Sequence, residues 1–221
     1  MRIVQFFSGY SIKGKSRGAL RHWSCLFEEW FLAIDRYCRI TKDDTPYWYN
    51  ERANIGILAG AAWRCGWIAL EEFQCEKTDM TPLEEDLSAK KVKWMGRADL
   101  YLASEYHHDY VEAKFKWINI NSEKMILQIS ECLDKACADA KNSKGENDSN
   151  DIGICFIPFY VKATKQEQMD ELITSAISRF GEVDTDACAW IFPQTVRTMA
   201  HDTTTNIRPG VALFARKIRS T

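Results

Sequence analysis

The spacing of apolar residues predicts two helices in the first third of the chain. Apolar side chains recur at three- and four-residue steps from Ser16 to Cys38, which is the spacing of one helical face. Ser16 can cap this helix, because its hydroxyl can accept a backbone N–H of the first turn. After the polar break TKDDTP, a second helix is predicted from Tyr47 to Arg64. Its small residues, in GILAGAAW, suit close packing against a sheet or another helix.

The segments that follow have the apolar pattern of strands. Residues 66–77, 92–104 and 109–117 are predicted to form three consecutive strands, with a polar loop or a short helix over 78–90. The turn EYHHD between the second and third strands is short enough for a hairpin or a slightly longer antiparallel connection.

The second half of the chain predicts strands separated by helices. A helical period recurs over 122–141 and again over 166–180, on either side of a nearly continuous apolar strand at 152–161. Such a run is typical of a central strand that is covered on both faces. Two last strands are predicted at 187–193 and 210–218.

The predicted element order is therefore ααβββαβαββ. A hairpin-type start followed by helix-linked strands predicts an α/β fold, with a mixed sheet and helices on both of its faces. The length of 221 residues suits a single domain. Within it, residues 1–44 are predicted to be a helical addition and residues 47–217 the core.

Composition narrows the class of protein. The chain is 46% hydrophobic and 12% aromatic, which argues against disorder, and its formal charge of -2 gives no overall basic excess for binding nucleic acid. The eight cysteines form no CxxC pair and mostly fall in apolar runs, which predicts reduced core thiols in a cytoplasmic protein. No apolar run reaches the ~20 residues that span a bilayer, and MRIVQFF is too short for a signal peptide, so no membrane partner is expected.

The segment GRADLYLASEYHHDYVEAKFKW carries charged residues within predicted strands. Because side chains alternate along a strand, Glu112, Lys114 and Lys116 share one face, and the hairpin can bring Asp99 beside Glu112. Two adjacent carboxylates resist ionising together unless a cation joins them, and Mg²⁺ prefers such oxygen ligands. A metal ion acidifies water, and a nearby lysine can orient or help to deprotonate that water, or stabilise charge on a phosphate. These residues therefore predict a site that cleaves phosphodiester bonds.

This arrangement resembles the PD-(D/E)XK nuclease superfamily, which has the restriction-endonuclease-like fold. GRAD, ending at Asp99, is similar to the first motif element, and EAK, at Glu112-Ala113-Lys114, is similar to the second. The resemblance implies that Asp99, Glu112 and the Ala113 carbonyl bind Mg²⁺, or alternatively Mn²⁺, and that Lys114 is the catalytic lysine. It also implies that Glu51, on the helix before the first strand, supports the metal through water.

The resemblance covers roughly residues 47–161, on element order and motif together. Ala98 stands where the motif has a proline, a replacement that is common in this superfamily. The predicted helix at 16–38 lies outside the minimal core of the family and is expected to be an addition to it.

Two positions of the predicted site have competing candidates. Glu71 and Glu72, on the first strand, rival Glu51 as the third acid, and only one of those two can face the site. The helix after the third strand often carries a further polar residue, for which Gln128 and Lys135 are both candidates.

Basic residues near the motif predict contacts with a nucleic-acid backbone, although a solvated strand face is an equally good interpretation. These residues are Lys90, Lys91, Lys93, Arg97, Lys114 and Lys116. His107 and His108 lie in the predicted turn, where paired histidines are expected to be exposed and inert. The aromatic residues of YWYNER could stack on bases, but a role in the core and at the start of a helix is favoured.

The sequence as a whole predicts a small cytoplasmic nuclease that needs Mg²⁺ and acts on nucleic acid, with DNA favoured. One alternative is a non-catalytic member of the same fold that binds nucleic acid or another protein. A further alternative is an interaction subunit whose aromatic first helix docks a protein partner or a second copy of the chain.

Overall fold

The computed structural model describes residues 7–14, 20–78, 93–142, 149–200 and 205–219. Within these ranges the strands form one mixed sheet in the order β1-β7-β9-β6-β4-β3-β2, and the two short strands β5 and β8 pair with β6. The strands are β1 (Ser8–Ile12), β2 (Ile68–Thr78), β3 (Lys93–Ala103), β4 (His108–Phe115), β5 (Ile118–Asn119), β6 (Asn150–Lys162), β7 (Ala187–Ile191), β8 (Asn206–Ile207) and β9 (Val211–Lys217).

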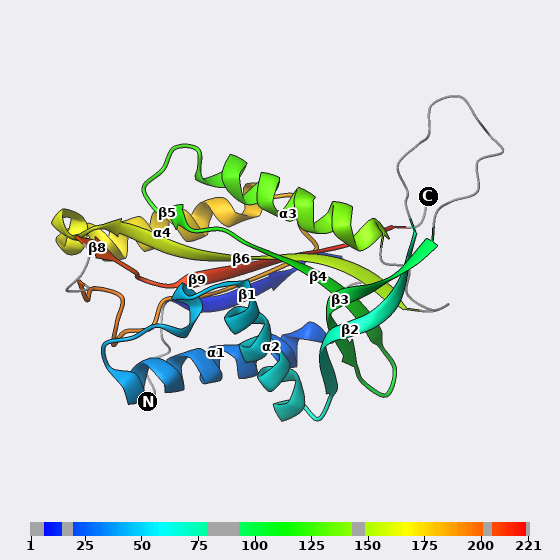
Figure 1. Cartoon of the computed structure of the whole chain (residues 1–221). Helices are drawn as coiled ribbons and strands as arrows, with labels where there is room; N and C mark the ends of the chain where they lie inside the picture. Colours follow the sequence, from blue (N-terminus) through cyan, green and yellow to red (C-terminus); the bar gives the residue numbers. More distant parts are fainter. Residues whose placement is uncertain (1–6, 15–19, 79–92, 143–148, 201–204, 220–221) are drawn as a thin grey trace.

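Helices cover both faces of this sheet, with α1 and α2 on one side and α3 and α4 on the other (Figure 1). The α-helices are α1 (Trp23–Thr41), α2 (Glu51–Arg64), α3 (Met125–Asn142) and α4 (Met169–Arg179). Short 3₁₀ turns are η1 (Pro46–Trp48), η2 (Ala163–Gln168) and η3 (Phe180–Glu182). The prediction of an α/β fold with a mixed sheet is therefore confirmed.

Two hydrophobic cores share the central strands. Ile154 and Phe156 of β6 point into the core beneath α1 and α2, whereas Cys155 and Ile157 point into the core beneath α3 and α4. The period-2 alternation of a strand produces this division, and it explains why the β6 sequence is apolar almost throughout.

The start of α1 was predicted wrongly. The helix begins at Trp23, and Ser16, the predicted cap, lies outside the described residues. A turn precedes the helix, in which the Trp23 N–H donates to the Leu20 carbonyl. This turn is fixed by a tertiary contact, because the ring of His22 is hydrogen-bonded to Asp109 of β4.

The second helix also starts later than predicted, at Glu51 and not at Tyr47. Asn50 is its cap, since its side chain accepts the Ala53 N–H at 2.8 Å, and Pro46 instead begins a separate 3₁₀ turn. The segment predicted as a helical addition also contributes the edge strand β1, which pairs antiparallel with β7.

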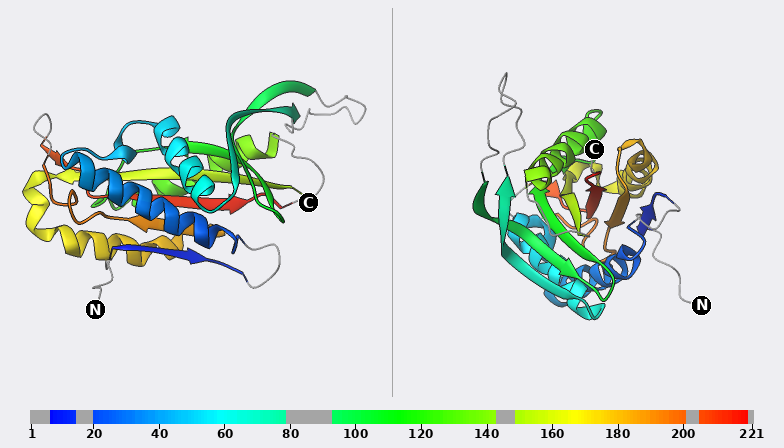
Figure 2. Two further views of the ribbon diagram at one scale, coloured as in Figure 1. Left: turned by 90° about the horizontal axis from the view of Figure 1, so that it is seen from below. Right: turned by 90° about the vertical axis from the view of Figure 1, so that its right-hand side faces the viewer.

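The sheet forks between β3 and β4, and this fork positions the predicted site. Strands β3 and β4 pair from Ala103–His108 as far as Leu100–Val111, while β3 continues with β2 and β4 continues with β6 in parallel. The far ends of β2 and β3 curl away from the helical layers as a projecting hairpin (Figure 2). Asp99 and Glu112 are the first residues beyond the last paired position of the two strands.

Among the described residues, no helix is both long enough and apolar enough to cross a membrane. The eight cysteines are all free thiols, and six of them are buried, in line with the prediction of core residues.

Candidate active site

Asp99 and Glu112 flank the point at which β3 and β4 separate. Asp99 Oδ2 accepts the backbone N–H of Ala113 at 2.7 Å. Because β3 no longer pairs with β4 at this point, the carboxylate replaces the backbone carbonyl that would otherwise accept this N–H. Glu112 is buried, with 4% of its surface exposed, so its charge needs a partner within the protein.

Lys77 of β2 supplies that partner, and sequence analysis missed it. Its Nζ lies 2.8 Å from Glu112 Oε1, so the side chain reaches past β3 from a strand that is not adjacent to β4. Gly96 of β3 leaves the room, because a Cβ at this position would lie 2.7 Å from Lys77 Cδ. The glycine of GRAD therefore lets a lysine side chain cross the strand.

Lys114 is held by a second residue that sequence analysis missed, Asp139 of α3. Lys114 Nζ lies 2.5 Å from Asp139 Oδ2 and donates to the Ala113 carbonyl at 3.1 Å. Burial works to lower the pKa of Lys114, but the hydrogen bond and charge of Asp139, with the charges of Glu51 and Asp99, raise it above its ordinary value. Lys114 therefore carries a full positive charge at neutral pH.

Close packing of α3 against the sheet brings Asp139 next to Lys114. Gly153 of β6 pairs with Glu112, and a Cβ on it would lie 2.6 Å from the backbone nitrogen of Cys137 in α3. Asp139 follows Cys137 by two residues and lies beside the apolar inner face of the helix. Its spacing from Ala136 suggests a position beside the inner face of α3 but does not show the contact with Lys114. Among the described residues, neither Gln128 nor Lys135 pairs with Lys114.

Glu51 approaches the same cluster from the first residue of α2. Burial raises its pKa above the ordinary value; the charge of Lys114 opposes this rise, and the charges of Asp99, Glu112 and Asp139 add to it. Glu51 therefore lies within electrostatic range of both motif acids and of Lys114.

The rival acids on β2 point elsewhere. Glu71 lies against α2, with Oε1 3.7 Å from the position of a Cβ on Gly56. Glu72 forms ion pairs with Arg52 at 2.7 Å and with Arg97 at 3.5 Å. Glu51 is therefore the acid that completes the cluster.

The predicted basic residues do not form one free patch in the described part of the chain. Arg97 is occupied by Glu72, and Lys116 Nζ lies 3.6 Å from Glu131 of α3. Lys93 belongs to β3, but its side chain lies outside the description. Also outside the described residues are Lys90 and Lys91.

The donor set fits a hard divalent cation in its chemistry. Asp99, Glu112, Glu51 and the Ala113 carbonyl offer only oxygen atoms, which Mg²⁺ prefers. Two ammonium groups already contact predicted ligands, since Lys77 binds Glu112 and Lys114 binds the Ala113 carbonyl. Among the described residues, there is no group of three or more His, Cys, Asp or Glu side chains that could hold a metal ion. Mg²⁺ usually takes one or two carboxylates and completes its shell with water, so it does not need such a group.

One histidine of the β3–β4 turn, His107, belongs to a separate, structural cluster, whereas His108 is exposed, as predicted. His107 stacks on His22 with ring centroids 3.9 Å apart, and is not the exposed residue that was predicted. The buried Asp109 lies 2.8 Å from His22 Nε2, accepts Trp23 Nε1–H at 2.8 Å, and accepts the side-chain N–H of Asn150 at 2.6 Å. This network fixes the start of α1 to β4.

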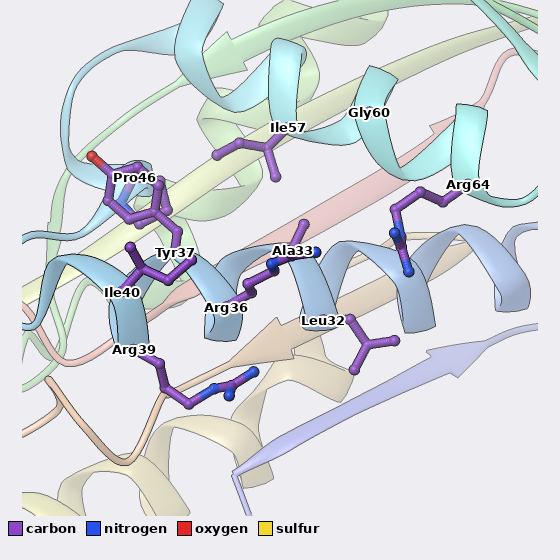
Figure 3. Close-up of a pocket in the computed structure, with 10 residues that line it drawn as sticks. All are labelled: Leu32, Ala33, Arg36, Tyr37, Arg39, Ile40, Pro46, Ile57, Gly60 and Arg64. Atoms are coloured by element: carbon purple, nitrogen blue, oxygen red, sulfur yellow. The ribbon is translucent and has the colours of Figure 1, made fainter.

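A groove of about 530 Å³ lies between α1 and α2, away from the fork (Figure 3). Leu32, Ile40 and Ile57 give it apolar walls, and Arg36 and Arg64 lie along it. Tyr37 of α1 also lines it, whereas Trp23, Phe27 and Trp30 do not, because they are buried in the core.

No family model, curated protein or solved structure matches the chain. The function has to be inferred from the chemistry of its own residues.

Proposed function

We propose that the protein is a divalent-cation-dependent nuclease that hydrolyses phosphodiester bonds of nucleic acid, with DNA as the favoured substrate. The observation that carries this proposal is the convergence of Asp99, Glu112 and Lys114 at the fork of the sheet, within electrostatic range of Glu51. Burying charged groups costs several kcal/mol or so per ion before pairing. A catalytic role explains why the chain accepts that cost on strands that are otherwise apolar.

The strand pairing around the fork supports a restriction-endonuclease-like fold. Helix α2 precedes the antiparallel strands β2, β3 and β4, and α3 then connects β4 to the parallel strand β6. This is the order of elements that the resemblance to PD-(D/E)XK nucleases implies. The motif acids lie on β3 and β4, as that resemblance requires.

Each residue of the cluster has a chemical role in this proposal. When bound by Asp99, Glu112 and the Ala113 carbonyl, Mg²⁺ would supply polarisation of the phosphate and acidification of water. Lys114 keeps its proton at neutral pH, so it stabilises negative charge on the phosphate and orients water, and is not the base. Glu51 has a raised pKa, which makes it the better proton acceptor for the attacking water.

Cleavage of a panel of single- and double-stranded DNA and RNA, with Mg²⁺, Mn²⁺ or EDTA, tests the proposal. Wild type should cut at least one substrate, and only when a divalent cation is present. Glu112→Gln and Lys114→Ala should each lose about 100-fold or more in rate, which is typical for removing a group that stabilises a transition state. The surface control Glu182→Gln should keep the wild-type rate. Equal cutting by wild type and both site variants would contradict the proposal.

The pairing of Lys77 with Glu112 and of Lys114 with Asp139 favours a second candidate, a non-catalytic member of the same fold that binds nucleic acid or protein. Because these ion pairs compensate the buried charges, the residues can be retained in a protein that has lost catalysis. No cutting by wild type, together with no change in melting temperature on adding metal, would support this candidate. The groove between α1 and α2 is where a protein partner or a second copy would then be sought.

A further inference from the structure

Two tryptophans connect the elements that carry the candidate catalytic residues. Trp117 follows Lys114 by three residues at the end of β4, and Trp48 precedes Glu51 by three residues before α2. The Trp117 Nε1–H donates to the Trp48 carbonyl at 3.1 Å, and the two ring centroids are 5.2 Å apart with a tilt of 34°. Three residues of extended chain span roughly 10 Å, so this aromatic pair lies within about that distance of Lys114.

The outer tryptophan is open to solvent. Trp117 is 45% exposed, and its inner edge packs on the ring of Phe115 at a centroid distance of 5.0 Å. Its hydrogen bond to Trp48 and its contact with Phe115 fix the orientation of the indole. A large aromatic face that is both fixed and exposed is suited to stacking against another flat group.

A partly buried arginine, Arg208, lies next to this pair. The guanidinium of Arg208 lies over the Trp48 ring, 3.8 Å from its centroid. Arg208 Nε is buried and has no hydrogen-bond partner in the part of the chain that the structure describes. The nearby acid Asp44 binds the hydroxyls of Tyr37 and Tyr49 at 2.7 and 2.5 Å. Arg208 therefore lies within electrostatic range of Asp44, whose side-chain hydrogen bonds go to the two tyrosines.

We propose that Trp48, Trp117 and Arg208 form a binding platform for an unpaired nucleotide of the substrate, next to the fork. A base stacks on the exposed face of Trp117, and a backbone phosphate accepts hydrogen bonds from the terminal N–H groups of the Arg208 guanidinium. In a duplex the base faces are already covered by their neighbours, so only an unpaired base can stack in this way. The inference depends on the proposed nuclease function for its substrate, and it narrows that substrate to single strands or unpaired ends.

Binding of fluorescently labelled dT₁₂ and rU₁₂, measured by anisotropy in EDTA, tests the platform without any cleavage. Loss of one stacked base costs about 1–3 kcal/mol, so Trp117→Ala should weaken binding by roughly 5- to 150-fold. Arg208→Gln should also weaken it, and Trp117→Phe, which keeps an aromatic face, should lie between wild type and Trp117→Ala. The better-bound strand shows whether the natural ligand is DNA or RNA.

The matched control is Trp63→Ala, because Trp63 is also exposed but lies in the last turn of α2, away from the platform. It should bind as wild type does, and a blunt duplex of the same length should bind at least about tenfold more weakly than the single strand. Unchanged binding in Trp117→Ala, equal binding of duplex and single strand, or no binding of any strand would overturn the inference.

The same measurement separates this inference from the proposed function. Tight single-strand binding that depends on Trp117, in a protein that cuts nothing with Mg²⁺, would support the platform and contradict the nuclease. Metal-dependent cleavage with no effect of Trp117→Ala on binding would support the nuclease and contradict the platform.

Discussion

At the residue scale, the charges at the fork neutralise one another only in part. Four carboxylates meet two ammonium groups, which leaves an excess of two negative charges in a half-buried place. A single divalent cation would remove that excess. Glu51 shows the effect of this excess negative charge most clearly, because burial and the neighbouring acids together raise its pKa although the charge of Lys114 lowers it.

The raised pKa of Glu51 predicts a pH-dependent effect on stability. The ionised carboxylate destabilises the folded state; this penalty is absent below the unfolded pKa of about 4.3 and grows as the pH rises through the folded pKa. Glu51→Gln removes the charge, so it should raise the melting temperature at pH 7 and leave it unchanged near pH 4. Thermal unfolding in EDTA measures this, with Glu182→Gln as the surface control. A lower melting temperature for Glu51→Gln at pH 7 would contradict the electrostatic account.

Two residues of the cluster could not be predicted from the sequence. Lys77 reaches Glu112 from a non-adjacent strand, and this depends on the curl of the sheet and on the space above Gly96. Asp139 has a helical spacing that only suggests a position beside the inner face of α3. Its contact with Lys114 depends on how closely α3 approaches β6 at Gly153. By contrast, the motif acids could be predicted, because alternation along a strand is a local property.

At the element scale, close contacts of helices with strands decide where the site forms. Helix α3 packs on β6 and β4, and Gly153 allows its close approach because it has no side chain. Helix α1 is fixed to β4 by the bonds from His22 and Trp23 to Asp109. Most elements could be predicted from their apolar periods. The start of α1 could not, because the contact of His22 and Trp23 with Asp109 determines where this helix begins. The edge strand β1 was missed because its five residues, SGYSI, carry too little apolar pattern.

Gly153→Ala should destabilise the protein and disturb the site together. Its Cβ would press on the backbone of α3 at 2.6 Å, a contact that no side-chain rotation relieves, so we expect a loss of roughly 2–3 kcal/mol in the free energy of unfolding. Denaturant unfolding measures it. Gly181→Ala is the matched control, because a Cβ at Gly181 meets no atom within 4 Å, and its change should stay within about 0.5 kcal/mol. Equal stability of the two variants would show that α3 can shift freely.

At the scale of the whole molecule, one sheet joins the two cores. The central strands β6 and β9 supply alternate side chains to both, so neither helical layer can lose its core while the other stays intact. The prediction of a single domain, made from the length of 221 residues, is consistent with this sharing. The β2–β3 hairpin projects from the helical layers, and Lys77, near the far end of β2, extends its side chain back to Glu112 at the fork.

This sharing predicts a single cooperative unfolding transition. Differential scanning calorimetry of the reduced protein should give one peak, with equal calorimetric and van't Hoff enthalpies. Two resolved peaks, or a calorimetric enthalpy well above the van't Hoff value, would mean that the helical layers unfold separately.

The central claim is that the cluster at the fork is a divalent-cation site and not a self-contained network of ion pairs. Calorimetric titration of the protein with Mn²⁺ tests it most directly, because it needs no knowledge of the substrate. Wild type is predicted to bind the ion at the fork, Glu112→Gln to lose that binding, and Glu182→Gln to retain it. Absence of binding by wild type, or equal affinity in wild type and Glu112→Gln, would contradict the claim and leave the fork as a structural ion-pair network.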